Sequence, residues 1–80
     1  MEGDVSDRPT ATQEDPTAIM GRHDLTPRQK AERIAEWFAR EACAFGESQG
    51  WSMRYERKGN EFVIFTDGIA TNAVEIMDLQ

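Results

Sequence analysis

The hydrophobic positions between residues 25 and 50 repeat with the period of an amphipathic helix. Thr26 and Gln29 can form a capping box, and Pro27 suits the first helical position because its missing N–H would have no partner there. The apolar residues fall on one stripe about 100° wide: Ala31, Ile34, Ala35, Phe38, Ala42 and Phe45. The sequence therefore predicts a helix that packs this stripe against the protein core.

Outside the apolar stripe, the predicted helix carries a charged face, a tryptophan, a cysteine and a glycine that can end it. Four charged residues lie opposite the stripe and are interpreted as a solvated face: Arg33, Glu36, Arg40 and Glu47. Trp37 lies at the flank of the stripe, where it can either cover the core or anchor a partner, since tryptophan is enriched at interface hot spots. Cys43 points away from the stripe and is interpreted as an unreactive thiol. Gly46 or Gly50 is expected to end the helix.

After the predicted helix, the hydrophobic period changes from 3.6 to 2. Apolar and polar residues alternate over 51–56, a turn follows at 58–60, and a second apolar run leads back, which predicts a β-hairpin. Its register depends on the turn. A two-residue turn places Tyr55 opposite Ile64, whereas a three-residue turn places Tyr55 opposite Val63 and exchanges the faces of the second strand.

The second run of the hairpin, residues 62–65, is apolar on both faces. Such a run predicts a central strand with the helix on one face. The other face is either covered by a second subunit or left exposed as an adhesive surface. Residues 69–80 fit either a third strand or a helix, and we favour the strand because Val74 and Ile76 alternate with polar or flexible neighbours. The expected fold is α+β, with one helix on a three-stranded antiparallel meander.

The first 16 residues are acidic and contain one valine and no aromatic residue. Because such a segment buries too little apolar surface to offset its backbone entropy, residues 1–16 are expected to be disordered and residues 17–80 to form one domain. A single helical turn between Asp15 and Gly21 is expected to attach to the core through Ile19 and Met20.

Nine basic and fifteen acidic residues give the 80-residue chain a net charge of −6. This balance disfavours general binding to duplex nucleic acid, which draws its affinity from neutralised phosphates. One cysteine cannot form an internal disulfide, and no apolar run has the length of a membrane span, so a cytoplasmic protein without membrane contact is expected. A chain this small would gain burial from forming a homodimer.

The sequence contains no recognisable catalytic or cofactor motif. His23 is the only imidazole and lies in a polar connector, where an exposed loop position is expected. One histidine and one cysteine are too few for a zinc site, and no phosphate-binding or calcium-binding loop pattern occurs. We therefore expect a protein that is not an enzyme and that uses no metal or cofactor.

A short acidic chain with an adhesive strand is typical of a protein-binding module. We expect a stoichiometric inhibitor or regulator of a basic nucleic-acid-handling protein, as in phage-type inhibitors such as anti-CRISPR proteins, in which carboxylates imitate phosphate charge. An antitoxin or an adaptor subunit would share this profile. The candidate contact residues are a tryptophan anchor and five acids: Trp37, Glu56, Glu61, Asp67, Glu75 and Asp78.

The alternative function is binding of single-stranded nucleic acid. Basic residues cluster near aromatic residues in the predicted hairpin, and this combination is typical of a surface on which bases stack. The candidate contacts for that function are Arg54, Tyr55, Arg57 and Lys58. The negative net charge and the need for aromatic residues in the core speak against it.

Overall fold

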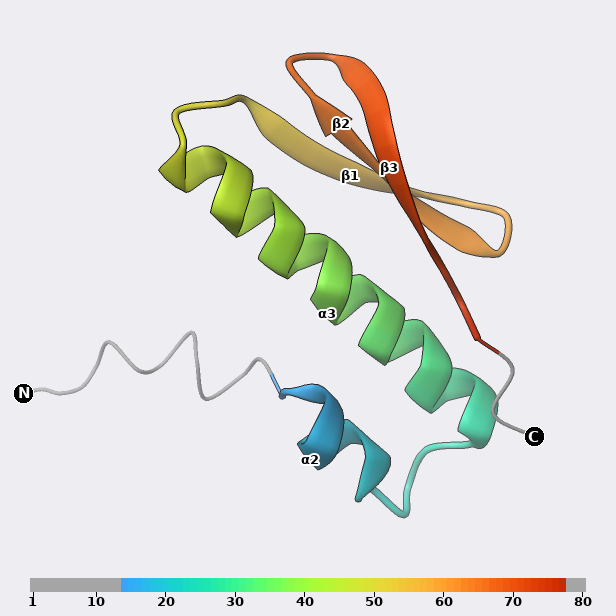
Figure 1. Cartoon of the computed structure of the whole chain (residues 1–80). Coiled ribbons are helices and arrows are strands. Elements are labelled where there is room, and N and C mark those ends of the chain that lie inside the picture. The colour runs from blue at the N-terminus through green and yellow to red at the C-terminus, as the bar shows by residue number, and fades with distance from the viewer. Residues whose placement is uncertain (1–13, 78–80) are drawn as a thin grey trace, which may run out of the picture.

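A computed structural model of the chain describes residues 14–77 (Figure 1). The elements, labelled as in Figure 1, are α2 (Pro16–Met20), α3 (Pro27–Ser48), β1 (Met53–Lys58), β2 (Glu61–Thr66) and β3 (Ile69–Glu75). The strands form an antiparallel sheet in the order β1-β2-β3, and the 22-residue helix α3 packs on one face of it. The predicted α+β meander is confirmed, including the third strand.

The N-terminal segment enters the fold at Asp15. Its carboxylate accepts a hydrogen bond from the backbone N–H of Ala18 at 2.8 Å and caps α2, which begins at Pro16. The folded part therefore starts before residue 17, and the disorder predicted for residues 1–13 concerns residues outside the described range. Ile19 is buried as predicted, but the prediction for Met20 is wrong, because half of that residue is exposed.

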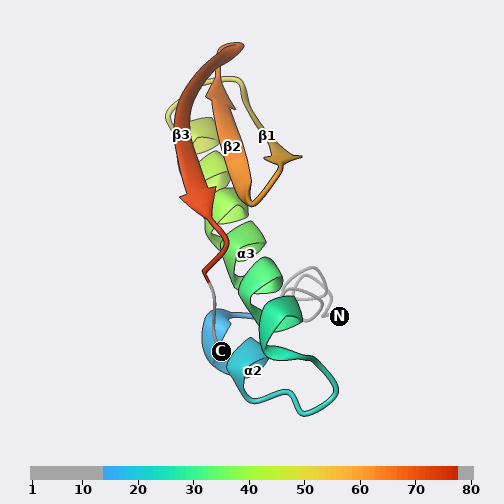
Figure 2. The ribbon, with the colours of Figure 1, turned by 90° about the vertical axis from the view of Figure 1, so that its right-hand side faces the viewer.

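Helix α2 lies beside the first half of α3, on the side away from the sheet (Figures 1 and 2). Lys30 of α3 donates a hydrogen bond from its Nζ to the backbone carbonyl of Met20 at 2.8 Å. This contact and the buried Ile19 attach α2 to α3. The second half of α3 has no such cover from α2.

Both ends of α3 are closed by local hydrogen bonds. Thr26 and Gln29 form the predicted capping box, each side chain accepting from the backbone N–H of the other at 3.1 and 2.9 Å. At the other end, Gly50 has a φ of 90°, and the N–H of Trp51 donates to the carbonyl of Gly46 at 3.0 Å. This is a Schellman ending. Of the two predicted stop residues, Gly50 therefore ends the helix.

The buried face of α3 differs from the predicted stripe. It is formed by small side chains: Ala31, Ala35, Ala39, Cys43 and Gly46. Phe38 and Phe45, predicted to be buried, are 49% and 62% exposed, whereas Cys43, predicted to point away from the core, is 8% exposed. Small residues face the sheet because α3 approaches it closely. A Cβ atom on Gly46 would overlap the side chain of Met53 in β1.

The hairpin between β1 and β2 has the register of the two-residue turn. Tyr55 pairs with Ile64 and Arg57 pairs with Phe62, so the three-residue alternative is wrong. β2 is the central strand, as predicted. Phe62 and Ile64 are buried beneath α3, and the residues between and beyond them point to the other face of the sheet.

The core between α3 and the sheet is small. Within the described residues, its buried members beyond the small residues of α3 are Phe62, Ile64 and Ile76. Met53, Tyr55 and other partly buried side chains surround them. The domain thus encloses few large side chains and leaves several others on its surface.

Candidate partner-binding surfaces

The side of the molecule that carries β1 is covered by polar contacts. The Tyr55 hydroxyl donates to the Glu36 carboxylate at 2.8 Å, and Glu36 forms an ion pair with Arg40 at 3.2 Å. Partial burial, together with the hydrogen bond to Glu36, raises the pKa of Tyr55 above its usual value. Arg57 reaches back to Glu32 of α3 at 3.3 Å. Glu36 thus contacts the sheet, and the prediction that it belongs to a solvated face opposite the core is wrong.

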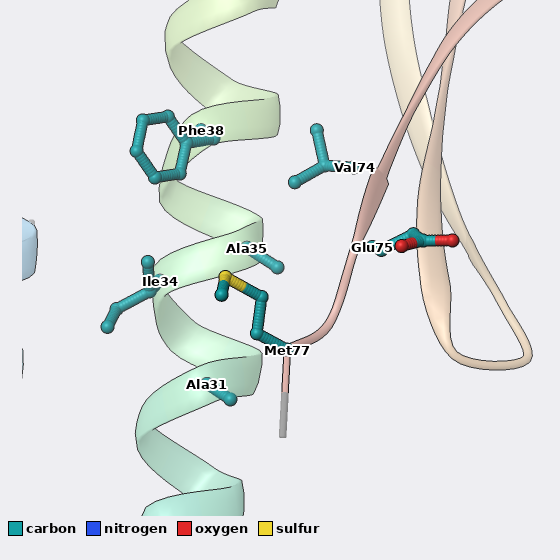
Figure 3. Close-up of a pocket in the computed structure, with 7 residues that line it drawn as sticks. All are labelled: Ala31, Ile34, Ala35, Phe38, Val74, Glu75 and Met77. Atoms are coloured by element: carbon teal, nitrogen blue, oxygen red, sulfur yellow. The ribbon is translucent and has the colours of Figure 1, made fainter. Parts of the chain in front are cut away.

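The opposite side, which carries β3, has an apolar groove of about 220 Å³. The groove lies between α3 and the end of β3 (Figure 3), and its lining residues are Ala31, Ile34, Ala35, Phe38, Val74, Glu75 and Met77. In Figure 3 the Met77 side chain reaches toward α3, whereas the Glu75 carboxylate points away from it. The walls are therefore almost entirely hydrocarbon.

Exposed apolar side chains extend this groove along α3. Phe45 lies seven residues after Phe38, which places both rings on the same side of the helix. Ile69 and Met77, at the start and beyond the end of β3, are each 67% exposed. We call this set, Phe38, Phe45, Ile69 and Met77, the β3-side apolar surface.

Two tryptophan rings border the β3-side apolar surface. Trp51 packs edge-to-face on Phe45 with ring centroids 6.5 Å apart, and it is about half exposed. Trp37 packs edge-to-face on Phe38 at 5.0 Å and is half-buried. Trp37, predicted as either a core lid or a partner anchor, thus lies against an exposed ring and is absent from the buried core.

The two edges of the sheet differ in charge. Four of the six residues of β1 are charged, whereas the seven residues of β3 include one charge, Glu75, and no proline. Charged side chains on an edge strand discourage pairing with another chain. The charges of β1 therefore disfavour pairing of that edge with another chain, whereas the β3 edge is open to such pairing.

The outer face of the sheet, opposite α3, brings together three of the predicted acidic residues. Directly paired residues share a face, and Lys58 pairs with Glu61, which pairs in turn with Glu75. Glu56 lies on the same face and is ion-paired with both Arg54 and Lys58. Within residues 14–77, Glu61 and Glu75 form no ion pair with a basic side chain, so they are the two uncompensated charges of this face.

The centre of the outer face is apolar. Val63 and Phe65 of β2 point there and are partly exposed, because neither α2 nor α3 covers this side. The Arg54 guanidinium lies 3.9 Å from the centroid of the Phe65 ring and shields part of it. The outer face thus has an apolar centre with carboxylates around it.

Two of the predicted acids lie elsewhere. Asp67 occupies the turn between β2 and β3 with a φ of 52°. Its backbone N–H donates to the Ser52 carbonyl at 2.8 Å and its carboxylate accepts from the Ser52 N–H at 3.0 Å, so it joins this turn to the start of β1. Asp78 lies outside the described residues.

The residues predicted to contact single-stranded nucleic acid are split between the two faces of the sheet. Arg54 and Lys58 lie on the outer face, whereas Tyr55 and Arg57 lie on the face that packs on α3. Each of the three basic residues is ion-paired with a carboxylate. The set does not form one basic stacking surface.

Comparison of the chain with protein-family models, with curated proteins and with solved structures gave no match. No family assignment follows from these comparisons.

The groups that could support metal or thiol chemistry are dispersed. Between residues 14 and 77, no three His, Cys, Asp or Glu side chains lie close enough together to hold a metal ion. Burial raises the pKa of the Cys43 thiol, and His23 is exposed in the connector before α3. Neither of the two described helices combines the length and apolar content needed to cross a bilayer.

Proposed function

We propose that the chain is a protein-binding module that acts stoichiometrically, by covering a basic surface of a nucleic-acid-handling protein. The observation that carries the proposal is the outer face of the sheet, where Glu56, Glu61 and Glu75 surround the apolar pair Val63 and Phe65. An apolar centre with a polar rim is the usual anatomy of a protein–protein interface.

The pairing of Glu61 with Glu75 supports a basic partner. Like charges directly opposite one another on neighbouring strands destabilise a sheet. Lys58 lies on the other side of Glu61 but forms its ion pair with Glu56 instead. A local arrangement that lowers stability is expected where it serves binding, and a basic surface would supply the missing counter-charge.

In the proposed mechanism, the chain blocks the basic surface of its partner and catalyses no reaction. The carboxylates of the outer face would occupy positions that phosphates take on the partner, and the apolar centre would exclude water around them. Because the contacting charges are exposed, salt screens them, and the affinity falls as the ionic strength rises. An antitoxin or adaptor would use the same face on a different protein.

The test is capture from nuclease-treated lysate by the tagged chain, with bound proteins identified by mass spectrometry. Glu75→Lys should abolish capture of a basic protein that the wild-type chain retains at low salt. Glu47→Lys is the matched control, since Glu47 is also exposed and the charge change is the same, but it lies on α3. Equal capture by both variants would contradict the use of the outer face.

A further inference from the structure

We propose that β3 pairs with β3 of a second copy around a two-fold axis, so that two sheets join into one of six strands and the two α3 helices lie on the same face of it. The β3-side apolar surface of each copy then faces that of the other. This dimer is independent of the proposed function, because it leaves the outer face of the joined sheet uncovered.

The first observation is the open edge. In Figure 2, β3 and β1 are the two edges of the sheet with β2 between them. A bulge beside Thr71 interrupts the first part of β3, which leaves residues 72–75 as its regular part. Within residues 14–77 this stretch has a free edge, its one charged side chain is Glu75 at the end, and β3 is exposed over most of its length.

The second observation is that the exposed apolar side chains lie on the same side as the open edge. Phe38, Phe45, Ile69 and Met77 are 49% to 67% exposed. At roughly 200 Å² for a large side chain, they present on the order of 500 Å² of apolar surface. That is more than half of the roughly 800 Å² that each partner buries in a standard interface. The strand edge and the groove would contribute the rest.

The third argument is geometric, because such a dimer needs large side chains at the positions of Phe38 and Phe45. Each α3 lies over β2, where Phe62 and Ile64 are buried, so the two helices would stand three strand spacings apart, about 14 Å. Helices in direct contact lie about 8–10 Å apart. The wider gap must be filled from both sides. Phe38 lines the groove with Val74 and Met77, and Phe45 lies on the same side of α3, so both rings are placed to fill it.

Two-fold symmetry also brings the two ends of the β3-side apolar surface into contact with the opposite ends of the same surface on the second copy. The symmetry makes the two α3 helices antiparallel, so the Met77 end of one groove meets the Phe45 end of the other copy. The β1 side offers no comparable match, because its Glu36, Arg40 and Arg57 are already engaged in contacts within the chain.

A second copy is favoured over another protein because this cover would add burial that so small a domain lacks. Within residues 14–77, its core cluster contains three large buried side chains besides the small residues of α3, and Ile19 of α2 is the only other large side chain that is buried. Domains near this size that bury so little surface are usually stabilised by oligomerisation, metals or disulfides. Cys43 is buried and free, and residues 14–77 hold no metal cluster. A second copy of the chain is available as a partner whenever the chain folds.

Sedimentation equilibrium of the full chain tests the dimer. The wild-type chain should have twice the monomer mass at micromolar concentration, and the Phe38→Glu/Phe45→Glu variant should be monomeric with an unchanged far-ultraviolet circular dichroism spectrum. Met20→Glu is the matched control, because Met20 is as exposed as Phe38 but lies on α2, and it should stay dimeric. A wild-type monomer at every concentration, or a variant that remains dimeric, would overturn the proposal.

Oxidative trapping tests the pairing of the strands even if the charged variant fails to fold. Cysteine at Asn72 or at Ala73, both exposed on β3, should give a covalent dimer for at least one position, because residues near the axis face their own counterparts. The buried Cys43 does not compete. Glu56→Cys on β1 should give no covalent dimer. Trapping through Glu56→Cys, or through neither β3 position, would show that the copies meet elsewhere or do not meet. The proposed function has its own test, because equal capture by Glu75→Lys and Glu47→Lys would contradict it whether or not two copies pair through β3.

Discussion

Individual residues decide where the backbone turns and how closely α3 approaches the sheet. Gly50 has a φ of 90°, a conformation that side chains with a Cβ rarely adopt, and nothing lies near a Cβ at that position. Gly21 ends α2 with an ordinary φ of −81°. The left-handed backbone conformation therefore requires glycine at position 50, whereas the backbone at position 21 does not require it.

Replacing Gly50 with alanine should lower the free energy of unfolding by about 1 kcal/mol, because the new side chain strains the left-handed backbone. Replacing Gly21 with alanine should leave stability unchanged or raise it slightly, since a Cβ there has no neighbour closer than 3.6 Å. Urea denaturation of both variants measures the difference. A Gly50→Ala variant as stable as Gly21→Ala would contradict the backbone argument.

At the scale of elements, α3 has three different faces. The face toward the sheet is built from small residues, the β1 flank from ion pairs, and the β3 flank from exposed rings. Ala39 is fully buried at the centre of the first face, whereas Ala44 lies on the exposed side of the same helix. The close packing of α3 on the sheet thus depends on the small size of the first set.

Ala39→Leu should destabilise the domain by about 1–3 kcal/mol, because the larger side chain forces α3 away from β2. Ala44→Leu adds the same atoms at an exposed position of the same helix and should change stability by less than about 0.5 kcal/mol. Thermal unfolding of the two variants, at matched protein concentration, gives the comparison. Equal stability would mean that α3 does not pack closely on the sheet through Ala39.

The sequence allowed the elements to be predicted because their signals are local. Thr26 and Gln29 define the start of α3, and period-two alternation with a glycine turn defines the hairpin. The buried face of α3 could not be predicted in the same way. Large residues dominate a hydrophobic stripe, whereas the close approach of β1 to Gly46 selects small ones.

The candidate site was predicted in part. Glu56, Glu61 and Glu75 are brought to one face because they alternate along antiparallel strands in the two-residue register, which local sequence left open. Asp67 instead stabilises a turn through Ser52, since acids at turns often bond to nearby backbone. The β3-side apolar surface was missed because its rings were assigned to the core. The small residues at every fourth position from Ala31 to Cys43 were the signal for the true buried face.

For the whole molecule, the main feature is the contrast between its two sides. The β1 side is charged and internally paired, whereas the β3 side combines an open strand edge with exposed rings. We infer that the β3 side joins two copies and that the outer face of the sheet, with Glu61 and Glu75, is left for a basic partner. The dimer would present these acids twice on one continuous sheet.

Hydrogen exchange at residue resolution, followed as the protein is diluted, tests the role of the β3 side most directly. If the β3 edge is an interface, amides in residues 72–75 are protected at high concentration and exchange faster on dilution, because pairing with the second copy is lost. The outward amides of β1 exchange rapidly at every concentration. Equal exchange in β3 and β1 that does not depend on concentration would contradict the account, because the β3 edge would then be as open in solution as the β1 edge.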